Sequence, residues 1–153
     1  MPVFILAKVA MIACWLFPLL KMAGIDAVLY DSPVTRAIAL IMFIAGLLVV
    51  VLSLVHLGRS ARVGIPIGET ELKTHGVYRL SRNPLYTGAF LMCLASCLYS
   101  PHPLNFLLAA IAVGVHHRIV TKEEEFLERA FGEKWLSYKR RVPRYIGLIR
   151  TDK

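Results

Sequence analysis

The chain has 153 residues, of which 57% are hydrophobic, and a formal net charge of +8. The length allows one domain, and the apolar share, with a mean hydropathy of +0.61, exceeds that of an ordinary soluble domain. Composition therefore indicates an integral membrane protein. Its basic charge must be tested against membrane topology before nucleic acid is considered, and we expect no nucleic-acid partner.

Two long apolar segments come first. Residues 37–57 read AIALIMFIAGLLVVVLSLVHL and carry no formal charge, and at about 1.5 Å per residue they suffice to cross a hydrocarbon core about 30 Å thick. Residues 3–20 are a weaker candidate, because Lys8 interrupts the run and Pro18 lies near its end. A cleaved signal peptide is the alternative there, but the basic residue lies inside the apolar run instead of ahead of it.

Two shorter apolar segments, residues 85–99 and 104–115, are separated by the sequence SPHP, which cannot continue a helix. They predict a helical hairpin. It either completes a bundle of four crossings, which we favour, or only dips into the bilayer as a re-entrant pair. The fold expected is an all-α membrane protein with about four transmembrane helices, followed by a C-terminal cytoplasmic amphipathic helix.

The basic residues are distributed unevenly along the chain. Five lie between the second and third apolar segments and ten follow from Arg118 onward, so fifteen of the eighteen share one side of the four-crossing arrangement. Since positive residues concentrate on the cytoplasmic side, both termini are predicted to be cytoplasmic. Attraction to anionic membrane lipids is a secondary consequence of the same charge.

The three cysteines, Cys14, Cys93 and Cys97, all fall inside predicted membrane segments. Cysteine behaves there as a small apolar residue, so no disulfide framework is expected. Cys93 and Cys97 are spaced for one helix face, but only His102 is a further candidate ligand, and we expect no metal site.

The stretch HGVYRLSRNPLYTG, residues 75–88, places polar groups at the start of an apolar segment. Asn83 and Pro84 favour a helix start, since Asn can cap backbone N–H groups and Pro fits the first turn. The arginines are explained either as anchors to lipid phosphates or as part of an anion site at that helix start. The group that would suit a carboxylate or phosphate comprises Gly76, Tyr78, Arg79, Arg82, Asn83 and Tyr86.

A second polar stretch occupies residues 116–146. Glu123, Glu124 and Glu125 are consecutive, so on a helix they point in different directions and at least one should be solvated. His117 has the helical spacing to share a stripe with Glu124. A second stripe predicts an amphipathic helix, at the membrane surface or packed against the bundle, and packing is favoured over substrate contact for its members. They are Leu127, Phe131, Trp135 and Tyr138.

Together the two stretches resemble the superfamily of isoprenylcysteine carboxyl methyltransferases and phospholipid methyltransferases. The first stretch matches a Gly-x-Tyr-Arg lead and an Arg-His-Pro-x-Tyr box. The second matches Glu-Glu-x-x-Leu-x-x-x-Phe-Gly, an aromatic pair and a basic Val-Pro, so the resemblance covers residues 75–146. Asn83 stands where the family usually has His. An amide can replace a hydrogen bond but not a proton acceptor, so this departure argues against a general base at the position and is compatible with a ligand-orienting role.

The resemblance implies one methyltransferase domain over residues 1–153, with the donor-binding half at about 75–146, and S-adenosylmethionine as methyl donor. It implies catalytic roles for Arg82 and Glu124. The donor carboxylate suits arginine or a helix N-terminus, and its ammonium and ribose suit carboxylates. The donor-binding residues implied are Gly76, Tyr78, Arg79, Arg82, Asn83, Tyr86, His117, Glu123 and Glu124.

The acceptor implied is a lipophilic small molecule or a lipid-linked substrate, reached at the cytoplasmic face of a membrane, which we expect to be a prokaryotic inner membrane. Isoprenylcysteine carboxyl O-methylation is favoured, and phospholipid amine N-methylation is the alternative. Two other hypotheses stay open at this point: a non-enzymatic tetraspanning scaffold, and a reductase-like relative that uses a reduced nicotinamide.

Overall fold

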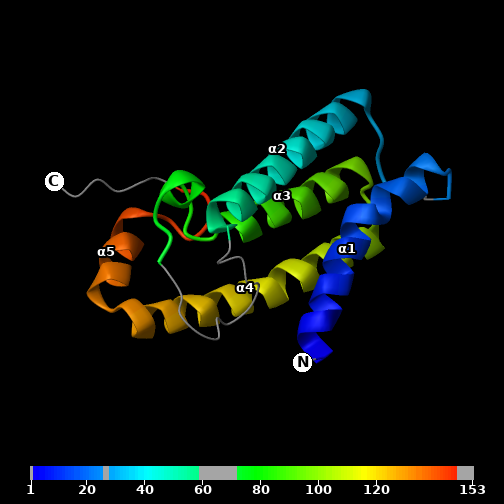
Figure 1. Ribbon diagram of the computed structural model, residues 1–153. Coiled ribbons are helices and arrows are strands. Elements are labelled where there is room, and N and C mark those ends of the chain that lie inside the picture. The colour runs from blue at the N-terminus through cyan, green and yellow to red at the C-terminus, as the bar shows by residue number, and fades with distance from the viewer. Residues whose placement is uncertain (1, 26–27, 59–71, 148–153) are drawn as a thin grey trace. The chain divides into compact units, whose positions relative to one another are not determined.

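The computed structural model describes residues 2–25, 28–58 and 72–147. These residues form five α-helices and one short 3₁₀-helix, and they contain no β-strand (Figure 1). In chain order the elements are α1 (Pro2–Met22), α2 (Pro33–Leu57), η2 (Gly76–Arg79), α3 (Pro84–Tyr99), α4 (Pro103–Phe131) and α5 (Glu133–Arg141). The prediction of an all-helical protein is confirmed.

Proline begins each of the first four α-helices. The first turn of a helix is the one place where a missing backbone N–H costs no hydrogen bond, and the fixed φ of proline suits it. Pro84 therefore starts α3 as predicted, and Pro103 starts α4 directly after the SPHP turn.

Among the residues that the structure describes, three helices are long and apolar enough to cross a membrane: Phe4–Met22, Pro33–Leu57 and Pro103–Phe131. The helix between the last two, α3, is apolar but has only 16 residues. At about 1.5 Å per residue it is shorter than a hydrocarbon core of about 30 Å. Four full crossings therefore stay a prediction, and the alternative, in which α3 enters the bilayer without crossing it, also stays open.

The last long helix differs from the expectation. An apolar helix was predicted over 104–115, with a separate amphipathic helix after it, but α4 continues without a break to Phe131. No proline follows Pro103 within it, and the chain turns only at Gly132, whose φ of 52° suits glycine. The predicted stripe is thus divided, with Leu127 and Phe131 on α4 and Trp135 on α5.

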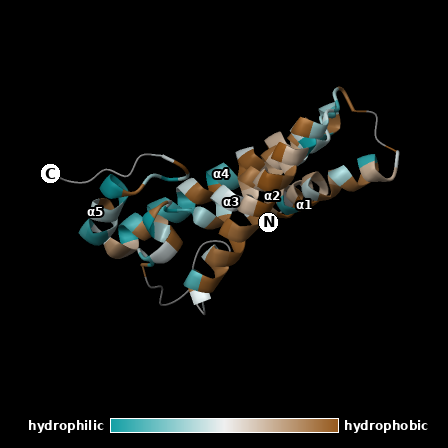
Figure 2. Ribbon diagram, turned by 90° about the horizontal axis from the view of Figure 1, so that it is seen from above, coloured by the Kyte–Doolittle hydropathy of each residue, from teal (hydrophilic) through white to brown (hydrophobic). Residues whose placement is uncertain are grey.

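The chain divides into two compact units, which are described separately. The first comprises residues 1–47 and 88–117, and the second comprises residues 48–87 and 118–153. The helices α2, α3 and α4 each contribute to both units. Figure 2 shows hydrophobic residues along most of α1 to α3 and hydrophilic residues on α5.

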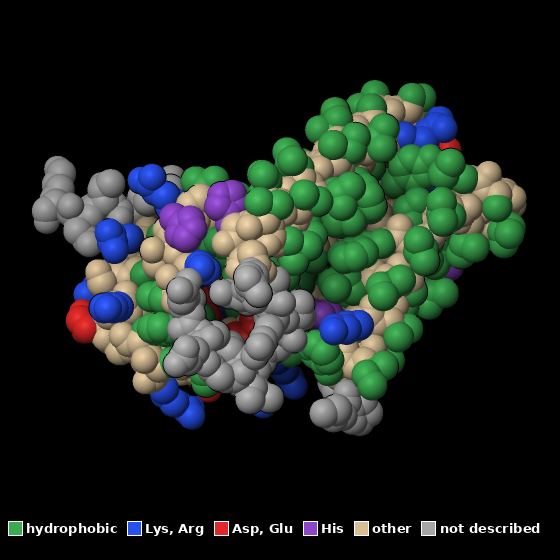
Figure 3. Space-filling model, in the orientation of Figure 1, with side chains coloured by type: hydrophobic (Ala, Val, Ile, Leu, Met, Phe, Trp, Pro, Cys, Tyr) green, Lys and Arg blue, Asp and Glu red, His purple; other side chains and the backbone are tan. Residues whose placement is uncertain are grey.

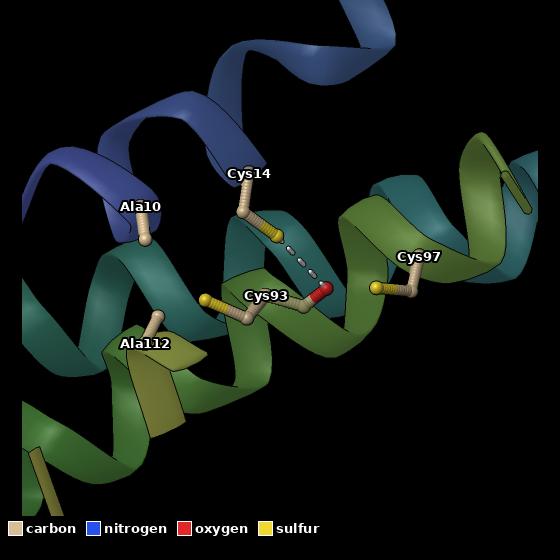
Figure 4. Close-up of a cluster of buried hydrophobic side chains, with 5 residues drawn as sticks. All are labelled: Ala10, Cys14, Cys93, Cys97 and Ala112. Atoms are coloured by element: carbon tan, nitrogen blue, oxygen red, sulfur yellow. Dashed lines mark hydrogen bonds between the residues drawn. The ribbon is translucent and has the colours of Figure 1, made fainter. Parts of the chain in front are cut away.

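The core of the first unit consists of small side chains. Its buried cluster draws on α1, α3 and α4, and its three cysteines are free thiols (Figure 4). Gly46 of α2 allows a similarly close approach, because a Cβ added there would lie 2.7 Å from the carbonyl oxygen of Gly88. Small residues let apolar helices pack closely where no hydrophobic effect drives them together. The cluster comprises Ala10, Cys14, Cys93, Cys97 and Ala112.

The core of the second unit is aromatic. Trp135, Tyr138 and Val142 are buried together, and Leu127 and Phe131 pack against them. The prediction that this stripe packs is therefore confirmed, even though Gly132 divides it between two helices. Around α5 the space-filling view shows Lys, Arg and Asp or Glu side chains at the surface (Figure 3).

Candidate functional site

Backbone hydrogen bonds bring the two polar stretches together in the second unit. The N–H of Arg82 donates to the carbonyl of Pro143 (2.9 Å), and the N–H of Asn83 donates to the carbonyl of Arg144 (3.2 Å). The hydroxyl of Ser81 also donates to that Arg144 carbonyl (3.0 Å). The segment before α3 and the segment after α5 are thus held in a fixed register, 61 residues apart in the chain.

Glu124 of α4 lies at the centre of this contact, with its side chain 4% exposed. Its Oε1 accepts a hydrogen bond from the side-chain amide of Asn83 (2.8 Å). Its Oε2 accepts two from Arg144, from Nε at 3.1 Å and from Nη2 at 2.9 Å. Arg82 Nη2 is 3.5 Å from Oε1. A buried carboxylate requires such partners, and these donors come from both polar stretches.

Asn83 does more than begin a helix. Its backbone carbonyl accepts from the N–H of Thr87, as expected at the start of α3. Its side-chain amide nitrogen, however, is a donor and bonds to Glu124. This side chain also donates to the carbonyl of Arg144 (3.4 Å), and neither of its two hydrogen bonds caps a helix. A role in orienting the ligand stays a prediction.

Arg82 is buried but incompletely paired. Its side chain is 7% exposed, and its Nε and Nη1 atoms have no hydrogen-bond partner among the described residues. The guanidinium carbon lies 5.6 Å from the centre of the Trp135 ring, a cation–π distance. Burial lowers the pKa of Arg82 from its ordinary value, while the carboxylate of Glu124 opposes that shift. Arginine nevertheless stays charged in proteins, so Nε and Nη1 of Arg82 are two buried cationic donor atoms suited to an anion.

Glu123 lies beside this cluster and accepts a hydrogen bond from the hydroxyl of Tyr86 (3.0 Å). Tyr78 is buried, and its backbone carbonyl accepts the hydroxyl of Tyr138. Burial, with a smaller contribution from Glu123, raises the pKa of Tyr78 to about 12. Burial also raises the pKa of Tyr145 to about 12. Both phenols are therefore neutral hydrogen-bonding groups near neutral pH.

Three predicted residues lie outside the cluster. Gly76 has a φ of 60°, and a Cβ at this position would clash with the ring of His56, so a steric reason is sufficient to explain glycine there. Arg79 is exposed at the end of η2. His117 is exposed on α4 and belongs to the first unit, whereas the cluster belongs to the second. Glu125, the third consecutive glutamate, is exposed as expected of at least one of them.

Sequence reasoning missed Arg144. It lies in a run of basic residues, KRRVPR, whose side chains look equivalent in the sequence. The one available signal was that Arg144 follows Pro143, which cannot continue a helix. Arg144 is thereby set apart from the exposed α5 residues Lys139, Arg140 and Arg141. Ser81, whose hydroxyl bonds to the carbonyl of Arg144, was also missed, because a single serine beside an arginine predicts no particular partner.

An open groove of about 850 Å³ also lies in the second unit. Tyr138 connects it to the segment that carries Tyr78 through the hydroxyl hydrogen bond. The side chains assigned to the groove include none of the predicted site residues and are mainly polar or basic. They are Leu72, Lys73, Thr74, His75, Phe131, Glu133, Lys134, Ser137, Tyr138 and Arg141.

Comparison with known proteins gives the family. The profile of the phospholipid methyltransferase family matches residues 34–134. The chain is 36% identical over 83 residues to protein-S-isoprenylcysteine O-methyltransferase of Mus musculus, which covers 54% of this chain and 29% of that protein. The Homo sapiens protein of the same name gives the same values. Protein-S-isoprenylcysteine O-methyltransferase A of Arabidopsis thaliana is 33% identical over 107 residues, covering 67% of this chain and 54% of that protein.

The chain thus spans about a third to about half the length of these relatives. They are animal and plant proteins, so they give no support to the predicted prokaryotic membrane. No solved structure matches the chain. The family match covers more than half of the chain and includes the Arg82 box and Glu124; the chain belongs to the phospholipid methyltransferase family, which confirms the resemblance that its two polar stretches carry.

Proposed function

We propose that this protein is a membrane methyltransferase that uses S-adenosylmethionine and acts at a cytoplasmic membrane face on a lipophilic acceptor. Family membership supports the reaction class, and the three long apolar helices support a membrane location. The names of the similar mouse and Arabidopsis proteins favour an isoprenylcysteine carboxylate as acceptor. Phospholipid amine N-methylation, which the family's description favours, is the second candidate.

The observation that carries the proposal is Arg82, a nearly buried guanidinium with two nitrogen atoms that have no hydrogen-bond partner in the described part of the chain. Leaving such donors unpaired costs free energy, so the arrangement is best explained by an anionic ligand that pairs with them. The methyl donor brings a carboxylate of suitable chemistry together with the reactive methyl group. In this proposal Arg82 binds that carboxylate through a charge-assisted hydrogen bond.

The other predicted residues have complementary roles. Glu123, oriented by Tyr86, and Glu124 provide negative charge for the donor's ammonium and hydroxyl groups. Asn83 orients Glu124. Displacement at a methyl group needs alignment of the acceptor and exclusion of water more than a covalent intermediate, so holding the donor in one position supplies much of the acceleration. Gly76, Tyr78, Arg79 and His117 stay candidate donor-binding residues.

Donor binding tests this function. Calorimetry on the detergent-purified protein should detect binding of S-adenosylmethionine and of S-adenosylhomocysteine. Arg82→Ala should weaken both by about tenfold or more, the effect of a lost charge-assisted hydrogen bond. Arg129→Ala removes the same charge from an exposed position and should leave affinity unchanged. A scaffold would bind neither compound, and a reductase-like relative would bind a reduced nicotinamide instead.

Asn83→His and Asn83→Ala separate two roles for the position at which this chain departs from its family. If Asn83 orients Glu124, Asn83→His should keep donor binding, because a ring N–H can replace the amide donor, and Asn83→Ala should weaken it. If the chain has instead lost a base, Asn83→His should sharply raise methyl transfer to a lipid extract at unchanged affinity.

The proposed topology has both termini in the cytoplasm and one domain over the whole chain. A reporter fused after Lys153 and one inserted near Asp31 should then report opposite sides of the membrane. Reporters on the same side would exclude both the four-crossing arrangement and the re-entrant pair, because each returns the C-terminus to the cytoplasm, and would indicate an odd number of crossings.

A further inference from the structure

The two arginines beside Glu124 contact it unequally. Arg144 donates two hydrogen bonds to Oε2, at 3.1 and 2.9 Å. The contact of Arg82 is longer, with Nη2 at 3.5 Å from Oε1, and its Nε and Nη1 have no partner within residues 2–25, 28–58 and 72–147. Arg82 is nevertheless the more deeply buried of the two, with 7% of its side chain exposed against 33% for Arg144. The buried cation, which gains most from a full ion pair, is therefore the one that lacks it.

The positions of the competing donors explain this. Arg144 is aimed at Glu124 by its own backbone, whose carbonyl accepts from the N–H of Asn83 and the hydroxyl of Ser81. The amide of Asn83 occupies Oε1 at 2.8 Å. Oε2 accepts two hydrogen bonds from Arg144 and Oε1 accepts one from Asn83, so the carboxylate keeps too few acceptor sites for a parallel two-bond pair with Arg82.

The charges of the cluster lead to the same conclusion. Around Glu124 itself, one carboxylate faces two guanidinium groups, of which Arg82 is buried and Arg144 is 33% exposed. One carboxylate cannot fully pair with both, so the buried Arg82 favours a further anion. Without Arg144, Glu124 and Arg82 would neutralise each other, and the preference for an anion would disappear.

We propose that Arg144 is a positioning residue, which by holding Glu124 keeps the Arg82 guanidinium open for the carboxylate of the methyl donor. This inference rests on the proposed function and deepens it. It predicts that loss of Arg144 lets Glu124 pair with Arg82, so that the donor's carboxylate, and not its other groups, loses its binding partner.

A comparison of two ligands isolates the carboxylate. Decarboxylated S-adenosylmethionine keeps the sulfonium, ammonium and nucleoside of S-adenosylmethionine and lacks only that group. In the native protein S-adenosylmethionine should bind about tenfold or more tightly than the decarboxylated compound, as expected for a charge-assisted hydrogen bond. In Arg144→Ala this ratio should fall towards one, mainly through weaker binding of S-adenosylmethionine.

Three variants control the measurement. Arg129→Ala removes one exposed positive charge and should keep the native ratio. Arg144→Lys keeps the charge but cannot form the parallel two-bond contact, so its ratio should be intermediate. Arg82→Ala should by itself bring the affinity ratio to about one. Adding Arg144→Ala should not change the ratio further, since both substitutions act through the binding of the donor's carboxylate. If Arg144→Ala does not fold, Arg144→Lys carries the test.

The outcomes separate this inference from the proposed function. A native protein that binds neither compound, or binds both equally, contradicts the role proposed for Arg82. A native ratio that survives in Arg144→Ala, or an equal loss of affinity for both ligands, overturns the positioning role of Arg144 while leaving the proposed function intact.

Discussion

The two units of this protein meet the same requirement, satisfaction of buried polar groups, in different ways. In the first unit the cluster of Ala10, Cys14, Cys93, Cys97 and Ala112 is small and uncharged, and backbone groups are paired inside helices. In the second unit Glu124 and Arg82 are nearly buried charges, and each requires partners of opposite charge or hydrogen-bonding groups around it. The comparison leads us to expect that disturbing close packing is costly in the first unit, and that removing one partner of the buried ion pair is costly in the second.

The largest expected effect comes from breaking the charge pairing. Glu124→Leu leaves Arg82 without a carboxylate in a buried site, and removing one partner of a buried ion pair costs about 3–5 kcal/mol. Hydrogen exchange should accelerate in peptides covering residues 78–86 and 120–131 while peptides of α1 keep their protection. Glu125→Leu, the same change at the neighbouring exposed residue, is the control. Equal effects of the two substitutions would contradict the comparison.

A smaller loss is expected from disturbing close packing in the first unit. The Cβ of Gly46→Ala would meet the carbonyl oxygen of Gly88 at 2.7 Å and Met92 Cγ at 2.8 Å. Overpacking of this kind costs about 1–3 kcal/mol. Nothing lies within 4 Å of a Cβ at Gly114, so Gly114→Ala in α4 should be neutral or stabilising by up to about 1 kcal/mol. Unfolding midpoints in detergent would show the difference, and equal midpoints would exclude a packing role for Gly46.

The sequence predicts most of the apolar helices, because a hydrophobic segment of that length can cross a membrane in few conformations other than a helix. The predicted segments 37–57 and 85–99 end where α2 and α3 end. The error lies in the last helix. Hydropathy changes sharply after Val115, but backbone hydrogen bonding continues, since α4 has no breaker before Gly132. Polarity is a property of side chains, and it does not end a helix.

For the site, the resemblance identified Arg82, Asn83, Tyr86, Glu123 and Glu124, which the structure brings together in the second unit. It could not identify which basic residue of the C-terminal run pairs with Glu124. That choice depends on the backbone pairing of Arg82 with Pro143 and of Asn83 with Arg144. A contact between segments 61 residues apart leaves no periodic pattern in the sequence.

Ser96 should have a modest effect. Its hydroxyl donates to the carbonyl of Cys14 and accepts the side-chain amide of Asn105 (3.1 Å), so it links α3 to α1 and α4. Hydrogen bonds between membrane helices contribute about 0.6–2 kcal/mol, and Ser96→Ala should reduce the free energy of unfolding by that amount. Ser137→Ala on α5 serves as a control outside this unit. A loss of unfolding free energy as large as that in Glu124→Leu would mean that a polar network is as important in the first unit as the buried charges are in the second.

The smallest effect is expected from an exposed ion pair in the second unit, and it tests whether burial or charge alone distinguishes that unit. Arg140 Nη2 lies 2.8 Å from Glu133 Oε1, but the two side chains are 59% and 75% exposed. Water already solvates both charges, so Arg140→Ala should change the free energy of unfolding by less than about 0.5 kcal/mol. That small change should shrink further as salt is added, because screening weakens exposed pairs. A destabilisation comparable to that of Glu124→Leu would mean that the number of charges, and not their burial, determines the stability of the second unit.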